Sequence, residues 1–170
     1  MKSQDIVILL KLLLIESTEW RFESLAKTLH MSSATIFFAL KRAEISGLYH
    51  KSTRTVNRTA FLEFLLYGLK YVFPGVIGKK AKGIPTSHSA NPLARLIVSE
   101  SDIYVWKSAF GNARGQTIEP LYVTIPQLAQ EDIQLYELLA LIDALRVGKA
   151  RERQLATALL TQKIMNKNAN

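Results

Sequence analysis

Cysteine is absent from the 170 residues, and histidine occurs only three times. Without cysteine the chain can form neither a disulfide nor a thiolate–metal site, and His30, His50 and His88 lie too far apart in sequence to suggest a metal motif. We therefore expect no metal and no other cofactor. The lack of cysteine also fits a reducing compartment, so we expect a cytoplasmic protein.

A hydrophobic run long enough to cross a bilayer is lacking as well. The most apolar stretch lies within residues 1–15, where Lys11 interrupts it and Asp5 stands where a signal peptide would be basic. We interpret residues 3–15 as an apolar helix capped by Ser3, and we expect no membrane partner. Such a helix needs cover on more than one side.

Acidic residues are the scarcer charge, with 14 against 22 basic ones, for a net charge of +8. Residues 41–82 hold nine basic residues and only two acidic ones, so nearly the whole excess lies in one quarter of the chain. Residues 91–170 are almost balanced, with nine basic and eight acidic residues. A local excess of this kind favours a polyanionic partner such as nucleic acid.

Hydrophobic periodicity predicts a mainly α protein with a small β component. Residues 22–29 form a short amphipathic pattern, His30 and Met31 follow as a tight turn, and residues 34–46 form a second helix capped by Ser32 or Ser33. In this second helix Ile36, Leu40 and Ala43 share the buried face. Residues 48–57 predict two short strands around a basic tip.

Residues 24–32, 33–43 and 46–48 together resemble the helix-turn-helix and the start of the wing in bacterial winged helix-turn-helix transcriptional regulators. The resemblance implies an N-terminal DNA-binding domain, residues 1–58, whose helix 33–46 enters the major groove while the basic wing follows the backbone or the minor groove. The expected DNA contacts are Ser33, Ala34, Thr35, Phe38, Lys41 and Arg42 on the helix, and Lys51, Arg54 and Arg58 in and after the wing.

Two phenylalanines depart from the pattern of this superfamily, which places polar or basic side chains there. We expect Phe37, near the edge of the outward face, to be packed. Phe38 is open to three interpretations: contact with thymine methyl groups, burial against another part of the chain, or contact with a protein partner.

Residues 59–170 are expected to form a helix-rich dimerisation or regulatory domain. Asn57 should cap a long helix over 59–73, residues 74–92 should form a loop, and residues 103–107 and 117–125 could form a small hairpin. Asp132 should cap a helix that Gly148 ends, and a last helix should begin near residue 150. Trp106 and Tyr122 are interpreted as core residues.

These patterns favour a sequence-specific double-stranded DNA-binding regulator, an autoregulating repressor, acting as a homodimer through helices 3–15 and 132–147. The alternative is an antitoxin or regulatory partner of a toxin or enzyme encoded nearby, with the winged helix used for protein contacts. An enzyme is not expected, since His88 lies among hydroxyl groups without an acidic residue at a diagnostic spacing. The cluster Arg146, Lys149, Arg151 and Arg153 is either a solvated face or a second contact for phosphates or an acidic partner.

Overall fold

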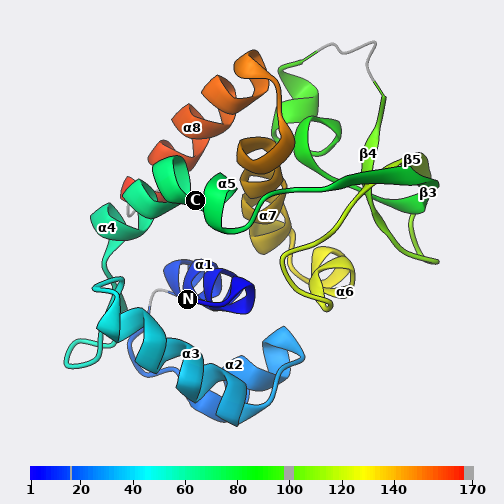
Figure 1. The fold of residues 1–170 in the computed structure, drawn as a ribbon. Helices are drawn as coiled ribbons and strands as arrows, with labels where there is room; N and C mark the ends of the chain where they lie inside the picture. The colour runs from blue at the N-terminus through cyan, green and yellow to red at the C-terminus, as the bar shows by residue number, and fades with distance from the viewer. Residues whose placement is uncertain (16, 98–101, 167–170) are drawn as a thin grey trace. The chain divides into compact units, whose positions relative to one another are not determined.

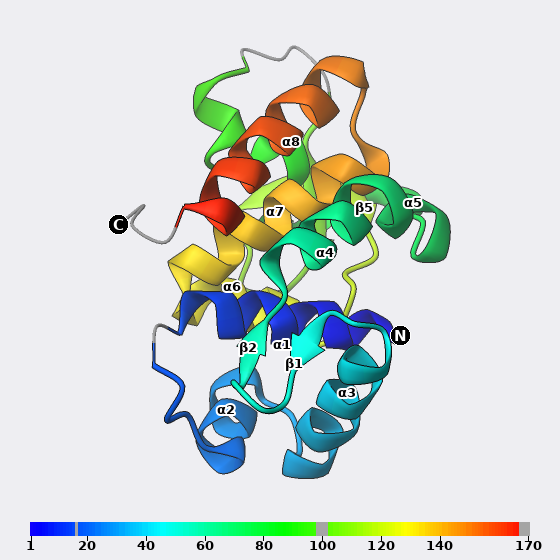
Figure 2. The same ribbon diagram turned by 90° about the vertical axis from the view of Figure 1, so that its left-hand side faces the viewer.

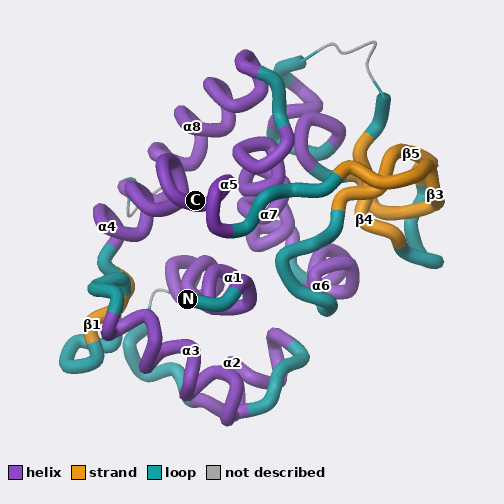
Figure 3. Tube along the Cα trace, viewed as in Figure 1, coloured by secondary structure: helices purple, strands orange, loops and turns teal. Residues whose placement is uncertain are grey.

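The computed structural model describes residues 1–15, 17–97 and 102–166 and is mainly helical with two small sheets (Figure 3). The chain divides into two compact units, residues 1–61 and 62–170. The first unit therefore ends slightly beyond the boundary expected after residue 58. Among the described residues, no helix combines the length and the apolar character needed to span a bilayer.

The first unit contains three helices followed by a short hairpin (Figures 1 and 2). The helices are α1 (Ser3–Leu14), α2 (Phe22–Leu29) and α3 (Ser33–Ile45), and the strands β1 (Tyr49–His50) and β2 (Thr55–Val56) pair antiparallel. The predicted bounds of α2 are confirmed. The cap of α1 is wrong by one residue, because Lys2 rather than Ser3 stands at the N-cap.

The apolar surface assigned to a dimer interface is covered within this chain. On α1, residues 6–10 are all inaccessible to solvent, and on α7 (Ile133–Val147) residues 138–145 are buried. Ile133, at the start of α7, is 73% exposed. The homodimer stays a prediction.

A helical segment leads from the first unit into the second. It consists of α4 (Arg58–Glu63), a π-helical turn (Phe64–Gly68) and α5 (Leu69–Val72). Asn57 caps it as predicted, because its side-chain oxygen accepts a hydrogen bond from the amide of Ala60 at 3.2 Å. The π turn inside the predicted helix was not foreseen.

The second unit contains a closed three-stranded barrel of β3 (Ile77–Pro85), β4 (Tyr104–Lys107) and β5 (Ala113–Ile118). β3 pairs antiparallel with both other strands, and β4 and β5 are parallel to each other. The loop predicted over 74–92 is therefore wrong, because β3 occupies residues 77–85 of it. The predicted hairpin is also wrong, since β4 and β5 pair parallel to each other, whereas the strands of a hairpin are antiparallel.

Glycines allow the strands of this small barrel to approach one another. A Cβ atom on Gly83 would lie 2.1 Å from the carbonyl oxygen of Trp106, and one on Gly111 would lie 1.9 Å from the carbonyl carbon of Gly83. Both distances are far below van der Waals contact. Glycine, taken as a loop signal in the sequence, here permits close pairing of strands.

Around the barrel lie two short 3-10 turns (Ser87–Ser89 and Leu93–Arg95), α6 (Ile125–Glu131), α7 and α8 (Ala150–Met165). The cap predicted at Asp132 is confirmed, because its carboxylate accepts the amide of Leu135 at 3.0 Å. α6 was not predicted. Trp106 is 1% exposed, which confirms it as a core residue.

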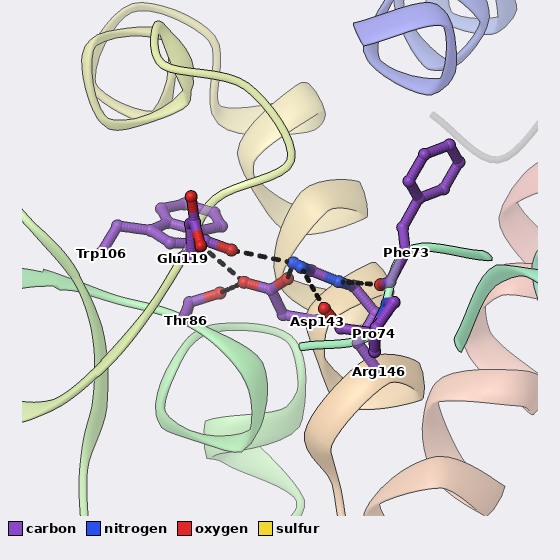
Figure 4. A network of polar contacts seen from close by, with 7 residues as sticks. All are labelled: Phe73, Pro74, Thr86, Trp106, Glu119, Asp143 and Arg146. Carbon is purple, nitrogen blue, oxygen red and sulfur yellow. Dashed lines mark hydrogen bonds and ion pairs between the residues drawn. The ribbon is translucent and has the colours of Figure 1, made fainter. Parts of the chain in front are cut away.

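A polar network fastens α7 to the barrel and to the chain around residue 73 (Figure 4). The buried Asp143 carboxylate accepts hydrogen bonds from Thr86 Oγ1 at 2.9 Å, from Trp106 Nε1 at 2.6 Å and from Arg146 Nη1 at 2.6 Å. Arg146 also donates to the carbonyl oxygens of Phe73, Pro74 and Glu119. One buried ion pair thus satisfies polar groups from four segments of the second unit.

Candidate nucleic-acid interface

A tight turn joins α2 to α3 and fixes the start of α3. His30 adopts a left-handed conformation (φ 52°), and the amide of Met31 donates to the carbonyl of Ala26 at 2.9 Å. Ser32 is the N-cap, because its side chain accepts the amide of Thr35 at 3.1 Å. The first turn of α3 is therefore held in place by bonds within the turn itself.

α3 has one buried face and one uncovered face. Ile36, Ala39, Leu40 and Ala43 are buried, which confirms the predicted core stripe. The opposite side is exposed over the full length of the helix, at Ser33, Ala34, Phe37, Phe38, Lys41, Glu44 and Ile45. Four of the six expected contacts on this helix, Ser33, Ala34, Phe38 and Lys41, lie on this face, and Thr35 is half-buried.

Arg42 is directed away from the exposed face, toward α1. Its Nε and Nη2 atoms bond the two carboxylate oxygens of Asp5 at 2.8 and 2.7 Å, and Asp5 is inaccessible to solvent. The hydrogen bond to Asp5 raises the pKa of Arg42. Arg42 therefore belongs to the packing of α3 on α1, and the expectation that it faces DNA is wrong for this arrangement.

Asp5 is a residue whose role the sequence analysis missed. A single carboxylate within an otherwise apolar helix was the available signal, since a buried charge requires a partner of opposite sign. The bidentate pair fixes both the position and the rotation of α3 relative to α1. In this way it orients the uncovered face.

Arg54, at the tip of the β1–β2 hairpin, is also engaged within the unit. Its guanidinium carbon lies 4.2 Å from the centroid of the Trp20 ring, and its Nη2 atom donates to the Trp20 carbonyl. Its left-handed conformation (φ 57°) turns the side chain back in this way. We therefore assign Arg54 to anchoring the hairpin, whereas Lys51 in the same hairpin is exposed and Arg58 is half-buried at the start of α4.

Aromatic rings connect this anchor to the exposed face of α3. Trp20 packs edge-on against Phe22 at 5.3 Å, Phe22 lies 6.3 Å from Phe37, and Phe37 lies 5.4 Å from Phe38. Exposure rises along this aromatic row from 8% at Trp20 to 39%, 52% and 54% at the three phenylalanines. Phe37, predicted to be packed, has two aromatic neighbours but about half of its surface is exposed. Phe38 is not buried either, which excludes the interpretation that it packs against another part of the chain.

His88 is buried beside two polar groups of the second unit. Its Nε2 lies 3.2 Å from the Asp102 carbonyl oxygen, and its Nδ1 lies 3.7 Å from Glu152, an acidic neighbour that the sequence did not reveal. The Ser87 hydroxyl is buried and makes no hydrogen bond with any described residue. Ser89 accepts the amide of Tyr104, and Thr86 is bound to Asp143. A cavity of about 210 Å³ adjoins His88 and Ser89.

The basic cluster at the start of α8 is partly internal. The Arg146 side chain is only 4% exposed and serves the Asp143 network, so it cannot meet a phosphate. Arg153 donates to the Gly148 carbonyl at 2.6 Å, while Lys149 and Arg151 are exposed. Within the described part of the chain, no group of three or more acidic or histidine side chains is placed to hold a metal ion.

Comparison with protein-family models, with curated proteins and with solved structures found no match to this chain.

Proposed function

We propose that the chain is a double-stranded DNA-binding transcriptional regulator of the winged helix-turn-helix type, a repressor, with α3 in the major groove and the β1–β2 hairpin beside it. The observation that carries the proposal is the uncovered face of α3, which runs the length of the helix next to a capped and tightly turned α2–α3 junction. A helix presented in this way is what helix-turn-helix proteins insert into DNA.

The exposed residues of this face suit the proposed contacts. Ser33 can bond a phosphate or a base edge, Ala34 can touch a thymine methyl group, and Lys41 can reach a phosphate or a guanine. On the hairpin, Lys51 can contact a phosphate. Among the described residues, no carboxylate forms an ion pair with Lys41 or Lys51.

The test is selection of duplexes from a random pool, followed by gel shifts in excess nonspecific competitor. Lys41→Ala and Lys51→Ala should each weaken binding, and each should lower the salt dependence of log Kd by about 0.9, as expected for one lost phosphate contact. Lys27→Ala, at an exposed lysine of α2, is the matched control. Failure to enrich any duplex, or equal loss with Lys27→Ala, contradicts the proposal.

A second candidate function is supported by the exposed part of the aromatic row. Phe22, Phe37 and Phe38, together with Ile45 at 79% exposure, form more apolar surface than a helix that reads only polar base edges requires. A protein-binding regulator, for example an antitoxin paired with a toxin or enzyme encoded nearby, would cover it.

The two functions are separated by Phe38→Asp. A partner that co-purifies in fixed stoichiometry from the native host should be lost on this change and retained on Tyr71→Asp, an exposed aromatic of the second unit. Retention of the partner by Phe38→Asp contradicts the protein-binding function.

A further inference from the structure

The lysines that appeared to lie in a loop are displayed on a strand of the barrel. Lys79, Lys80 and Lys82 all belong to β3 and are exposed. In the register of the sheet, Arg114 of β5 lies directly opposite Lys82, and Lys107 of β4 lies opposite the next residue, Gly83. Cations from three strands therefore lie at one end of the barrel, with Lys82 and Arg114 on one face and Lys107, which pairs with Gly83, on the alternate face.

Lys82 and Arg114 form a like-charged cross-strand pair. Residues directly opposite in an antiparallel pair share a face, with Cβ atoms about 5 Å apart, and like charges there destabilise the sheet. Lys80, two residues before Lys82 on the same strand, forms an ion pair with Asp102 at 2.8 Å. No described carboxylate forms such a pair with Lys82, Arg114 or Lys107. This end of the barrel is therefore a positive site that an anion would stabilise.

An aromatic ring projects from the turn at the same end. Phe110 is 82% exposed and lies in the 108–112 connection between β4 and β5. The amide of Ser108 donates to the Lys82 carbonyl at 3.2 Å, and the amide of Phe110 donates to the Ser108 hydroxyl at 3.3 Å. Gly111 is pressed against Gly83, where no side chain would fit. The turn is thus fixed on β3, and Phe110 is presented in a defined place.

We propose that this barrel-end surface, formed by Lys82, Arg114 and Phe110, binds single-stranded nucleic acid. The two cations contact phosphates and the Phe110 ring stacks on an unpaired base, which is the combination that single-strand-binding proteins use. A base within a duplex is already stacked on its neighbours and does not offer its face to the ring. The site lies in the second unit and does not depend on DNA binding by α3.

The test measures fluorescence anisotropy of labelled oligo(dT) and oligo(U) of about ten nucleotides, a length within the usual single-strand site size, with the full chain. The double variant Lys82→Thr with Arg114→Thr should bind at least tenfold more weakly, and its salt slope should fall by about 1.4, which corresponds to two phosphate contacts on a single strand. Because this change also removes the like-charged pair, the variant should melt no lower than the wild type. Arg95→Thr with Arg151→Thr, two exposed cations of the same unit, is the charge-matched control.

Stacking is tested separately from charge. Phe110→Ala should weaken binding about tenfold and Phe110→Trp should restore it, whereas Tyr71→Ala, which removes another exposed aromatic ring, should have no effect. The separate oligo(dT) and oligo(U) titrations tell whether DNA or RNA is preferred, and Lys41→Ala should change neither.

Four outcomes overturn the proposal. They are absence of binding to either oligonucleotide, an equal loss of affinity for a matched duplex in the Lys82→Thr/Arg114→Thr variant, displacement of the oligonucleotide by poly-glutamate of equal charge, and loss of binding only in Lys41→Ala. The last outcome would place the contact on α3 and leave DNA binding by the first unit intact. Conversely, single-strand binding that depends on Lys82 and Phe110 stands even if no duplex is enriched by the α3 face.

Discussion

Both units of this chain bury an aspartate against an arginine, but they use the pair differently. In the first unit Asp5 and Arg42 join α1 to α3 through two parallel bonds, and the arginine side chain stays 27% exposed. In the second unit Asp143 and Arg146 lie one turn apart on α7, and the arginine side chain is 4% exposed. The first pair connects two helices, whereas the second gathers irregular segments onto one helix.

The difference lies in what each arginine does beyond its ion pair. Arg146 donates to the backbone carbonyl oxygens of Phe73, Pro74 and Glu119, so its removal frees three contacts that hold irregular segments on α7. Among the described residues, the Arg42 side chain donates hydrogen bonds to Asp5 and to no backbone carbonyl oxygen. We therefore expect the two pairs to differ in their contribution to the free energy of unfolding, and replacing each arginine with methionine measures that difference.

Arg146→Met should have the largest effect, a loss of about 4 to 5 kcal/mol, because it leaves Asp143 buried without its cation. Urea unfolding followed by Trp106 fluorescence in a Trp20→Phe background measures it, with the exposed Arg151→Met as control. Burial raises the pKa of Asp143, an effect that Arg146 opposes. In the variant the folded pKa should rise further, so stability should be regained at low pH and lost as the pH rises through that pKa. A loss below about 1 kcal/mol would remove the distinction between the units.

Arg42→Met should lower the free energy of unfolding by about 3 kcal/mol. This is at the lower end of the range for a broken buried pair, because Asp5 keeps one hydrogen bond from the amide of Lys2. Trp20 fluorescence in a Trp106→Phe background reports it. The neighbouring exposed residue provides the control, and Lys41→Met should change stability by less than about 0.5 kcal/mol. If the two variants unfold alike, the Asp5 pair does not hold α3.

Tyr136 should make the stability of the second unit depend on pH in the alkaline range. Its hydroxyl donates to the Pro85 carbonyl at 2.7 Å, and burial raises its pKa to about 12. Because the folded pKa lies above the unfolded one, this stabilisation is complete below pH 10 and is lost as the pH rises through 12. Its size is roughly 2 kcal/mol after allowance for partial exposure. Tyr136→Phe should lack this pH dependence in urea unfolding, and an unchanged profile would contradict the assignment.

Arg54 should show the smallest effect. Arg54→Ala loses the stacking on Trp20 and its hydrogen bond, for about 1 to 2 kcal/mol. Arg54→Gly loses the same contacts but accepts the left-handed backbone without strain, so it should be about 1 kcal/mol more stable than Arg54→Ala. Trp20 fluorescence measures both. The reverse order would show that the hairpin tip relaxes in the variants.

The sequence predicted helices well and the barrel poorly, for a physical reason. α2, the buried stripe of α3 and the Asp132 cap follow from local periodicity and capping, which a short window of residues contains. β3 has exposed residues over its first half and glycines at its crossings, so it shows no alternation. Its pairing with β5 depends on residues far along the chain.

The candidate site was predicted in outline but not in its contacts. The wheel of α3 placed Phe38 and Lys41 outward, as the structure has them. It placed Arg42 outward as well, whereas Arg42 lies between the two faces and pairs with Asp5 on a different helix. Arg54 was predicted to contact DNA because of its charge. Trp20, which it packs against, lies far away in the sequence, so no local pattern indicated that contact. The surface around Phe110 was missed because β3 was taken for a loop.

The barrel also sets an order of events during synthesis. β3 is made first and has to pair with both β4 and β5, and its Ile77 partner, Ile118, is far along the chain. At ribosomal rates the strand therefore waits for seconds with open hydrogen-bonding edges, a state prone to pairing with other chains. Lys79, Lys80 and Lys82 repel the same segment of a neighbouring nascent chain. The positive strand thus also acts as a safeguard against aggregation while the unit is incomplete.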